Sequence, residues 1–345
     1  METSIIGLKN RGNTCYLNTS IQCLFNLPLL TNYFISNNYL NDINNRCNEM
    51  KGKKTNEILL SREYSKLVKA ISNSNSSIEP RSFHELIQTM DEKFEGYEQQ
   101  DSQELMALIL DNLHEGLKYD VDISYSGNIE HSLDEIVVES IKNWKNDLQS
   151  KYSIIAELFF GQFINKIISL ENHNKDELIS KKFEMFNMLN IPIYGKTLYD
   201  SLSKYFEKEI LESKYLHEKT NKYLETYRQI KLMKVPKYLI IVLKRYRNVN
   251  SGNLLKSTNI ISFPIDNLDL SSYSEGYETL ECNLRLISIG CHKGMLNGGH
   301  YYAICRNKDD LWYKCDDQDI EEYSVESNKN NLFKEGYILI YEKIE

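Results

Sequence analysis

The sequence lacks the features that would place it in several common protein classes. Its 345 residues carry a formal net charge of −8, whereas a nucleic-acid-binding domain normally has a basic excess. The acidic balance instead favours a partner with a basic surface. No apolar run approaches the roughly 20 residues that a membrane-spanning helix needs, and the first residues lack the pattern of a secretory signal. We therefore expect no nucleic-acid partner, no membrane insertion, a cytoplasmic and/or nuclear location, and a monomer.

The seven cysteines are scattered and include no C-x-x-C pair. An odd number of cysteines without close pairs favours free thiols over a disulfide framework. Cys15 differs from the others because it follows the turn-prone Gly12-Asn13-Thr14 and precedes an apolar pattern with helical spacing. With Asn13 as the N-cap, Cys15 would lie in the first helical turn, where the helix dipole stabilises a thiolate. Cys15 is thus the candidate nucleophile, and the alternative is a small buried cysteine at a helix start.

The chain divides into a helical first part and a strand-rich last part. Residues 1–150 show mainly helical spacing, with a polar insertion after residue 118. Residues 236–345 contain short β-rich runs separated by turn residues. Residues 151–235 have mixed strand and loop character. The expected fold class is α+β, in a single domain over 1–345.

A base for the nucleophile is expected near the end of the chain. His300 follows Gly298 and Gly299 at the start of a predicted strand, and a second strand follows the turn "NKDD". Pairing these strands brings Asp316 or Asp317 toward His300, where a carboxylate can hold the imidazole in position. The alternative is a histidine and acids at ordinary strand ends.

An oxyanion donor is also available before the nucleophile. Asn10 lies five residues before Cys15, in a loop that can fold back over the helix end. Its side-chain amide could stabilise a developing oxyanion together with backbone N–H groups. The alternative role of an asparagine in such a loop is turn formation.

These segments together resemble a known family. "GLKNRGNTCYLNTSIQCLFNLPLL" resembles the cysteine box of the ubiquitin-specific proteases, which are papain-like deubiquitinating enzymes with thumb, palm and fingers subdomains. "GYEQQDSQELMALILDNLHEGL" resembles their thumb segment, and "FFGQF", "VPKYLIIVLKRY", "GGHYYAICRN", "WYKCDDQDI" and "GYILIYEK" follow in the family's order. The resemblance implies a helical thumb in about 1–150, fingers and part of the palm in 151–235, and the rest of the palm in 236–345.

The resemblance also assigns roles to the candidate site residues. It implies that Cys15 is the nucleophile, His300 the general base, Asp316 the third member and Asn10 the oxyanion donor. Asp316 is preferred to Asp317 because it follows the family's aromatic-Lys-aromatic pattern, although Cys315 stands where an aromatic residue is usual. Asp317 could instead orient the histidine or support the oxyanion.

Two further groups of residues are expected to bind substrate. Asp101 and Glu104 form a D-x-x-E helix-capping pattern, and by resemblance their counterparts bind the basic tail of ubiquitin. Both roles are compatible, because a capping carboxylate can keep a lone pair for an arginine. The resemblance further implies that Gly298, Gly299 and Tyr301 line a narrow channel for the terminal glycines of that tail.

The fingers depart from the family pattern. Many members hold a zinc ion there through two C-x-x-C pairs, but the matching positions near Ser169 and His217 carry none, because no cysteine lies between Cys47 and Cys282. His173 and His217 alone cannot complete a four-ligand tetrahedral site. We therefore expect no structural zinc and no cofactor, with the fingers held by packing of aromatic residues. These residues are Phe159, Phe160, Phe183 and Phe186.

The expected activity is hydrolysis of the isopeptide or peptide bond after the C-terminal Gly-Gly of ubiquitin, with ubiquitin and ubiquitinated proteins as partners. Two alternatives remain: the same chemistry on another ubiquitin-like modifier, or a catalytically silent ubiquitin-binding module. The silent module would need damage to the triad, whose three residues are all present. A general papain-like peptidase is disfavoured, since it has no use for a Gly-Gly channel or a large fingers region.

Overall fold

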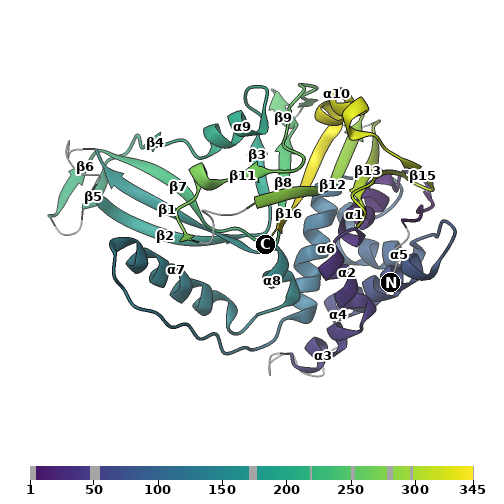
Figure 1. The fold of residues 1–345 in the computed structure, drawn as a ribbon, viewed down its shortest axis with the longest axis horizontal. Helices are drawn as coiled ribbons and strands as arrows, with labels where there is room; N and C mark the ends of the chain where they lie inside the picture. Colours follow the sequence, from purple (N-terminus) through teal and green to yellow (C-terminus); the bar gives the residue numbers. More distant parts are fainter. Residues whose placement is uncertain are drawn as a thin grey trace.

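The arrangement of the chain was taken from a computed structural model that describes residues 5–46, 55–170, 177–217, 220–249, 253–277, 283–295 and 298–344. Figure 1 shows helices gathered on one side, a long sheet projecting on the other, and a larger sheet between them. We refer to these three parts as thumb, fingers and palm. Among the described residues, no helix is both long and apolar enough to cross a bilayer.

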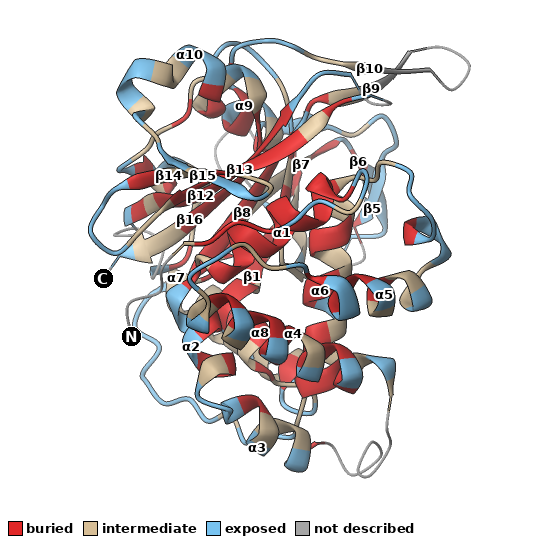
Figure 2. Ribbon diagram, turned by 90° about the vertical axis from the view of Figure 1, so that its right-hand side faces the viewer, coloured by how far each residue is buried: buried red, intermediate tan, exposed pale blue. Residues whose placement is uncertain are grey.

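The thumb is built from the first helices of the chain. α4 packs against α2, α5 and α6, while α1 lies between α6 and the palm. All eleven residues of α1 are buried (Figure 2), because protein surrounds this helix on every side. The elements are α1 (Cys15–Phe25), α2 (Pro28–Ile35), α3 (Asn38–Asn44), α4 (Asn56–Asn73), α5 (Arg81–Met90), η2 (Glu92–Phe94) and α6 (Ser102–Leu117).

The palm is a mixed sheet whose order is β15-β14-β13-β12-β16-β8-β3, with β11 paired to β12. Among the described strands of this sheet, only β3 and β8 pair in parallel. The bounds are β3 (Leu189–Pro192), β8 (Tyr238–Lys244), β11 (Leu268–Asp269), β12 (Asn283–Lys293), β13 (His300–Arg306), β14 (Trp312–Asp316), β15 (Asp319–Glu322) and β16 (Gly336–Ile344).

Strand β8 shows why the palm strands read as continuous apolar runs. Its residues alternate between two faces, because successive side chains of a strand point in opposite directions. Tyr238 and Ile240 join the core shared with the thumb. Leu239 and Ile241 join a second core, which is covered by α9 (Leu198–Tyr205) and α10 (Val325–Glu335). Both faces of the strand are therefore buried, as the run "YLIIVLK" predicts.

The fingers form a four-stranded sheet of order β2-β1-β7-β4, followed outward by a small β5-β6 hairpin. The bounds are β1 (Gly161–Ser169), β2 (Leu178–Phe186), β4 (Glu209–Ile210), β5 (Tyr215–His217), β6 (Lys222–Leu224) and β7 (Thr226–Lys234). The remaining short elements are η3 (Ser271–Tyr273) and a β9 (Tyr246–Val249) to β10 (Asn253–Lys256) hairpin beside the palm.

The aromatic packing of the fingers differs from the prediction. Phe186 stacks on Phe163 with a centroid distance of 4.3 Å, as expected for a residue that holds the sheet. Phe159 instead packs against Tyr238 of the palm at 5.8 Å. Phe160 and His114 likewise meet outside the fingers, at 5.0 Å, and no ring contact of Phe183 is seen in the described part of the chain. Phe159 and Phe160 do not hold the fingers because the short helix α8 (Ile154–Phe159) turns them toward the thumb and palm.

Helix α7 (Ser132–Leu148), within the polar insertion, runs along the fingers (Figure 1). Glu139 forms a 2.8 Å ion pair with Lys181 of β2, and the Ser140 hydroxyl donates to Gln162 Oε1 of β1 at 2.5 Å. The base of the fingers is therefore fixed by α7 as well as by its own strands.

Candidate active site

Cys15 is the first residue of α1 and is 2% exposed. The chain reaches it through two left-handed residues, Gly12 (φ +101°) and Asn13 (φ +54°). Thr14, rather than the predicted Asn13, occupies the N-cap position. The left-handed backbone turns the Asn13 side chain away from the helix, where it donates to Tyr97 O at 2.8 Å. The result is a sharp turn that leaves a thiol at a helix N-terminus.

His300 begins β13 and meets Asp316 at the end of β14, with 2.5 Å between His300 Nε2 and Asp316 Oδ1. The two strands pair as a hairpin with Ala303 opposite Cys315, so the contact expected from strand pairing is present. A hydrogen bond with Cys15 is the main cause that raises the pKa of His300 to about 9, and the bond with Asp316 adds to it while burial opposes it. His300 is therefore an imidazolium at neutral pH, directly beside the Cys15 sulfur.

Asp316 is held on its other side by a residue that the sequence did not indicate. Lys314 Nζ lies 2.8 Å from Asp316 Oδ2 and 3.3 Å from a carboxylate oxygen of Glu321. Burial tends to raise the pKa of Asp316, but the bonds from Lys314 and His300 outweigh it and leave that pKa below its usual value. Asp316 thus remains a carboxylate that can stabilise the imidazolium.

Asp317 faces Asn10 rather than the histidine. Its Oδ2 accepts from Asn10 Nδ2 at 2.8 Å, and its Oδ1 accepts from Asn18 Nδ2 at 2.8 Å. The backbone of Asp317 is left-handed (φ +53°), and its carbonyl accepts from Leu8 N at 2.8 Å. Of the two roles left open for Asp317, this geometry fits support of the oxyanion donor.

The Asn10 amide is fixed in orientation. Its Oδ1 accepts from the backbone N–H groups of Gly12 at 2.8 Å and Thr14 at 3.2 Å. Its Nδ2 must therefore point toward Asp317, which accepts one of its two hydrogens. The second hydrogen has no acceptor among the described residues, so it remains available as a donor.

The two expected tail-binding acids both have partners within the chain. Asp101 is the N-cap of α6, where it accepts from Gln103 N at 2.8 Å and from the Tyr337 hydroxyl at 2.8 Å. Burial raises the pKa of Asp101. Glu104 forms an ion pair with Lys93 of η2, and both side chains remain partly exposed. Asp101 caps the helix as predicted, but Glu104 does not complete the D-x-x-E pattern, because its carboxylate pairs with Lys93 and not with the backbone N–H of Asp101.

The three expected channel residues differ in exposure. Gly298 is exposed, whereas Gly299 is buried and a Cβ there would lie 2.0 Å from His292 Nε2. Only glycine therefore fits at position 299. Tyr301 is 4% exposed and packs against the His292 ring at 4.3 Å. Tyr301 thus supports the segment from behind more than it lines an open surface.

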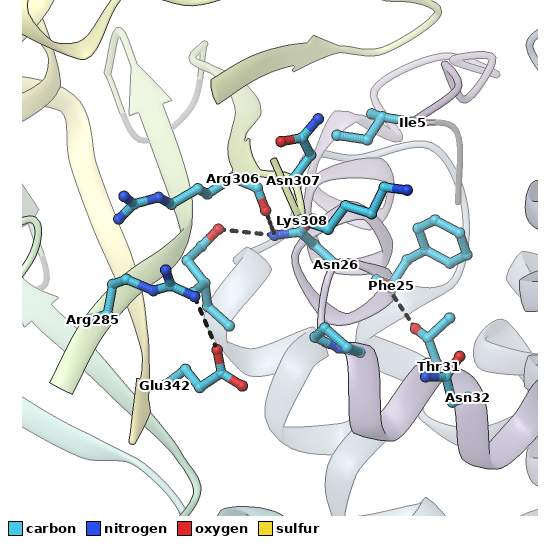
Figure 3. Close-up of a pocket in the computed structure, with 12 residues that line it drawn as sticks. Ile5, Phe25, Asn26, Thr31, Asn32, Arg285, Arg306, Asn307, Lys308 and Glu342 are labelled. Carbon is cyan, nitrogen blue, oxygen red and sulfur yellow. Dashed lines mark hydrogen bonds and ion pairs between the residues drawn. The ribbon is translucent and has the colours of Figure 1, made fainter. Parts of the chain in front are cut away.

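The far end of α1 is tied to the palm. Asn26 Nδ2 donates to the carbonyl oxygens of Ile287 at 2.8 Å and Arg306 at 3.1 Å. Figure 3 shows these bonds beside a cavity of about 240 Å³. Arg285, which lines this cavity, lies 3.7 Å from Glu342, so its charge is compensated within the chain. Because α1 rises about 1.5 Å per residue, this cavity is well separated from Cys15.

Only one group in the described part of the chain brings together three histidine, cysteine or acidic ligands at metal-binding spacing. That group is His300, Asp316 and Asp317, which belongs to the site already described. In the fingers, His217 Nδ1 is hydrogen-bonded to Thr220 Oγ1 at 2.8 Å. His173, Cys47 and Cys282 lie outside the described residues.

Comparison with known proteins identifies the family. The sequence profile of the family described as ubiquitin carboxyl-terminal hydrolase matches residues 6–341. The chain belongs to this family. The predicted family membership is thereby confirmed.

Individual members of the family share about a quarter to a third of the aligned residues with this chain. Ubiquitin carboxyl-terminal hydrolase 2 from Homo sapiens is 27% identical over 351 residues, covering 98% of this chain and 55% of the relative. Ubiquitin carboxyl-terminal hydrolase 15 from Rattus norvegicus is 34% identical over 196 residues, covering 56% of this chain and 19% of the relative. The alignment with the hydrolase 2 relatives includes nearly all of this chain, but the chain spans only about half the length of those relatives.

Solved structures confirm the α+β fold. The SAGA Ubp8/Sgf11/Sus1/Sgf73 module bound to ubiquitin aldehyde matches with a TM-score of 0.76 and 22% identity, over 100% of this chain and 71% of that chain. The corresponding module bound to monoubiquitin matches with a TM-score of 0.74 at 22% identity, with the same coverage of the two chains. At this identity the likeness establishes the fold alone.

Proposed function

We propose that this chain is a cysteine-type deubiquitinase that hydrolyses the isopeptide or peptide bond after the C-terminal Gly-Gly of ubiquitin. The observation that carries the proposal is the convergence of Cys15, His300 and Asp316 in a member of the ubiquitin carboxyl-terminal hydrolase family. The residues come from α1, β13 and β14 and form a connected hydrogen-bonded group. A nucleophile, a base and an orienting acid in this order support acyl transfer through a thioester.

The first half-reaction forms the thioester. The Cys15 thiolate attacks the carbonyl carbon of the terminal glycine, and the carbonyl electron pair moves onto oxygen. The free Asn10 Nδ2 hydrogen and backbone N–H groups near Cys15 stabilise this oxyanion. The His300 imidazolium then donates its proton to the leaving lysine amine as the C–N bond breaks.

The second half-reaction releases ubiquitin. Neutral His300 accepts a proton from water as the water oxygen attacks the thioester carbonyl. When the tetrahedral intermediate collapses, the C–S bond breaks and the thiolate leaves, which restores the pair of thiolate and imidazolium. Asp316 keeps the imidazole ring oriented in both halves, and Lys314 in turn holds Asp316.

Substitution of Asp317 by asparagine is expected to lower kcat by about tenfold to a hundredfold, with a small effect on folding. Asparagine tolerates the left-handed backbone but replaces one accepting oxygen with an amide that faces either Asn10 or Asn18. The measurement is steady-state hydrolysis of a fluorogenic ubiquitin substrate. Asn10→Ala should cause a similar loss, and the double variant should lose less than the sum. Additive losses would contradict the shared role.

The pH dependence of kcat/KM should report the raised pKa of His300. Because the imidazolium is the working form and its pKa is about 9, kcat/KM should fall as the pH rises through about 9. Asp316→Asn should move this alkaline limb to lower pH, since the carboxylate helps to raise that pKa. By the same linkage, His300 stabilises the folded state fully below its ordinary pKa near 6.5, and this contribution is lost toward pH 9. An alkaline limb that stays in place in Asp316→Asn would contradict the assigned role of Asp316.

Recognition of the modifier tail is proposed to involve the acidic end of α6. Glu104 is partly exposed and would exchange Lys93 for an arginine of the tail. Gly298 and Gly299 would admit the tail's terminal glycines and exclude larger side chains. We also propose a reducing compartment, cytoplasmic and/or nuclear, because the cysteines of the described segments are free thiols.

The proposed function is tested by reacting the chain with ubiquitin that carries a C-terminal thiol-reactive warhead, read by intact mass. A single adduct on the wild type and none on Cys15→Ser would support both ubiquitin recognition and the nucleophile. No adduct on the wild type would overturn ubiquitin as the modifier. Probes built on other ubiquitin-like modifiers, run in parallel, would then show whether a different modifier is accepted or the triad is silent.

A further inference from the structure

The loop that precedes His300 has a narrow neck. Lys293 at the end of β12 pairs with His300 at the start of β13. Immediately beyond this pair, Gly294 is left-handed (φ +95°), and a Cβ on it would lie 2.9 Å from the Cα of Gly299. The two sides of the loop are therefore in backbone contact at Gly294 and Gly299. Whatever fixes these two glycines also fixes the backbone that carries the His300 side chain.

A thumb side chain holds one side of this neck. Gln99 lies between η2 and α6, and its Nε2 donates to Gly299 O at 2.6 Å. Its Oε1 accepts from Gly299 N at 3.1 Å. A carboxamide presents an N–H donor and a carbonyl acceptor side by side in one plane, which matches the C=O and N–H groups of a single residue. Gln99 therefore binds both polar groups of Gly299 and leaves that residue little freedom to shift.

A lysine holds the other side. Lys256 of β10 donates from Nζ to His292 O at 2.6 Å and to Gly294 O at 3.0 Å. Tyr246 of β9 meets the ring of His292, with 2.5 Å between its hydroxyl and His292 Nδ1. That ring packs directly against Gly299, since a Cβ added to this glycine would lie only 2.0 Å from His292 Nε2. The neck is thus secured from the β9-β10 hairpin on one side and from the thumb on the other.

We propose that Gln99 is a positioning residue for the candidate catalytic histidine, and that its two-point bond to Gly299 holds His300 in line with Cys15. This inference rests on the proposed function of the Cys15–His300 pair. The His300 side chain is 42% exposed, so surrounding side chains do not confine it on all sides. The position of the ring then depends on the His300 backbone as well as on the bond with Asp316, and catalytic geometry tolerates displacements of only about 0.5 Å.

The test is the rate at which iodoacetamide alkylates Cys15 between about pH 4 and pH 9.5, followed by peptide mass. A free thiol has a pKa of about 8.5 and is nearly all protonated at pH 6, so alkylation at pH 6 measures thiolate held by the His300 imidazolium. Gln99→Ala is expected to slow alkylation at pH 6 by about tenfold or more and to leave the rate at pH 9.5 unchanged. Gln100→Ala is the matched control, because the structure shows no hydrogen bond from its side chain. Cys15→Ser gives the background.

Gln99→Glu provides a second, isosteric variant. Its carboxylate keeps the acceptor for Gly299 N but places a negative oxygen against Gly299 O, so alkylation should be slow at pH 7. On acidification to about pH 4, below the ordinary glutamate pKa of about 4.3, most of the carboxyl groups gain a proton and can donate again. The rate should then recover toward that of the wild type, which a merely structural defect would not do.

The outcomes separate this inference from the proposed function. A Gln99→Ala profile identical to that of the wild type would overturn the positioning role while leaving Cys15 and His300 intact. A wild-type chain without acid reactivity at Cys15 would overturn the pairing itself, and with it both proposals. A loss shared equally by Gln100→Ala would also overturn the proposal, since it would assign the effect to the loop rather than to the bond.

Discussion

Cys15→Ser should bind ubiquitin as the wild type does and hydrolyse its conjugates at least about four orders of magnitude more slowly. The hydroxyl of serine has nearly the size of the thiol, so the sharp turn at Gly12–Thr14 and the first turn of α1 should be kept. A serine hydroxyl, however, is far less acidic than a thiol and cannot form the ion pair with His300. Loss of the nucleophile alone removes nearly the whole of the catalysis that the connected group provides.

Two measurements establish this result. Cleavage of a ubiquitin conjugate gives the rate, and fluorescence polarisation of labelled ubiquitin gives the affinity. Cys23→Ser is the matched control because Cys23 lies two turns further along the same buried helix and contacts no member of the site. Hydrolysis by Cys15→Ser at the wild-type rate would remove Cys15 from the mechanism, as would an equal loss in Cys23→Ser.

Arg245→Met should reduce the free energy of unfolding by about 3–5 kcal/mol. Arg245 is completely buried and donates to three carbonyl oxygens from two segments of the chain: Asn259 O at 2.9 Å in one, and Phe333 O and Gly336 O at 2.7 Å each in the other. Methionine fills much of the volume but offers no donor, so these carbonyls lose their partner. Relief of the desolvation of the guanidinium, which lowers the pKa of Arg245 to about 10, offsets only part of that loss.

The stability loss is measured by urea unfolding followed by circular dichroism. Arg228→Met is the matched control, because Arg228 forms an exposed 2.6 Å ion pair with Glu209 and such pairs contribute about 0–1 kcal/mol. Arg245→Lys should recover only part of the loss, since an ammonium group cannot reach three divergent carbonyls. An equal free energy of unfolding for Arg245→Met and the wild type would contradict the prediction. It would mean that the desolvation penalty of the buried guanidinium cancels the stabilisation from its hydrogen bonds.

Features of the site that depend on contacts between residues close in the sequence could be predicted from the sequence. The His300–Asp316 contact could be predicted because a single hairpin turn brings the two residues together. The partner of Asp317 could not be resolved, because Asn10 lies 307 positions away and the approach depends on the bond from Leu8 N to Asp317 O. The N-cap lies one residue later than the sequence predicts, because the Asn13 side chain does not reveal that its own backbone is left-handed.

Two other features left no pattern in the sequence. Phe159 and Phe160 look like part of the fingers because they precede β1, but which core an aromatic residue enters is decided by the direction of α8. Gln99 sits in a polar segment with a second glutamine beside it. Only the approach of the thumb to Gly299 distinguishes one amide from the other.

The place of β16 in the palm has a consequence for biosynthesis. This strand is the last of the sheet in chain order, yet it lies in the middle, between β12 and β8. While β16 has not yet emerged from the ribosome, the edges of β12 and β8 that will pair with it are unpaired. Such unpaired edges are prone to association with other chains. Cys15, His300 and Asp316 have all been synthesised by then, but the sheet that aligns them is incomplete. Proteolytic competence should consequently appear only after β16 has left the ribosome, and the nascent chain should be prone to association until then.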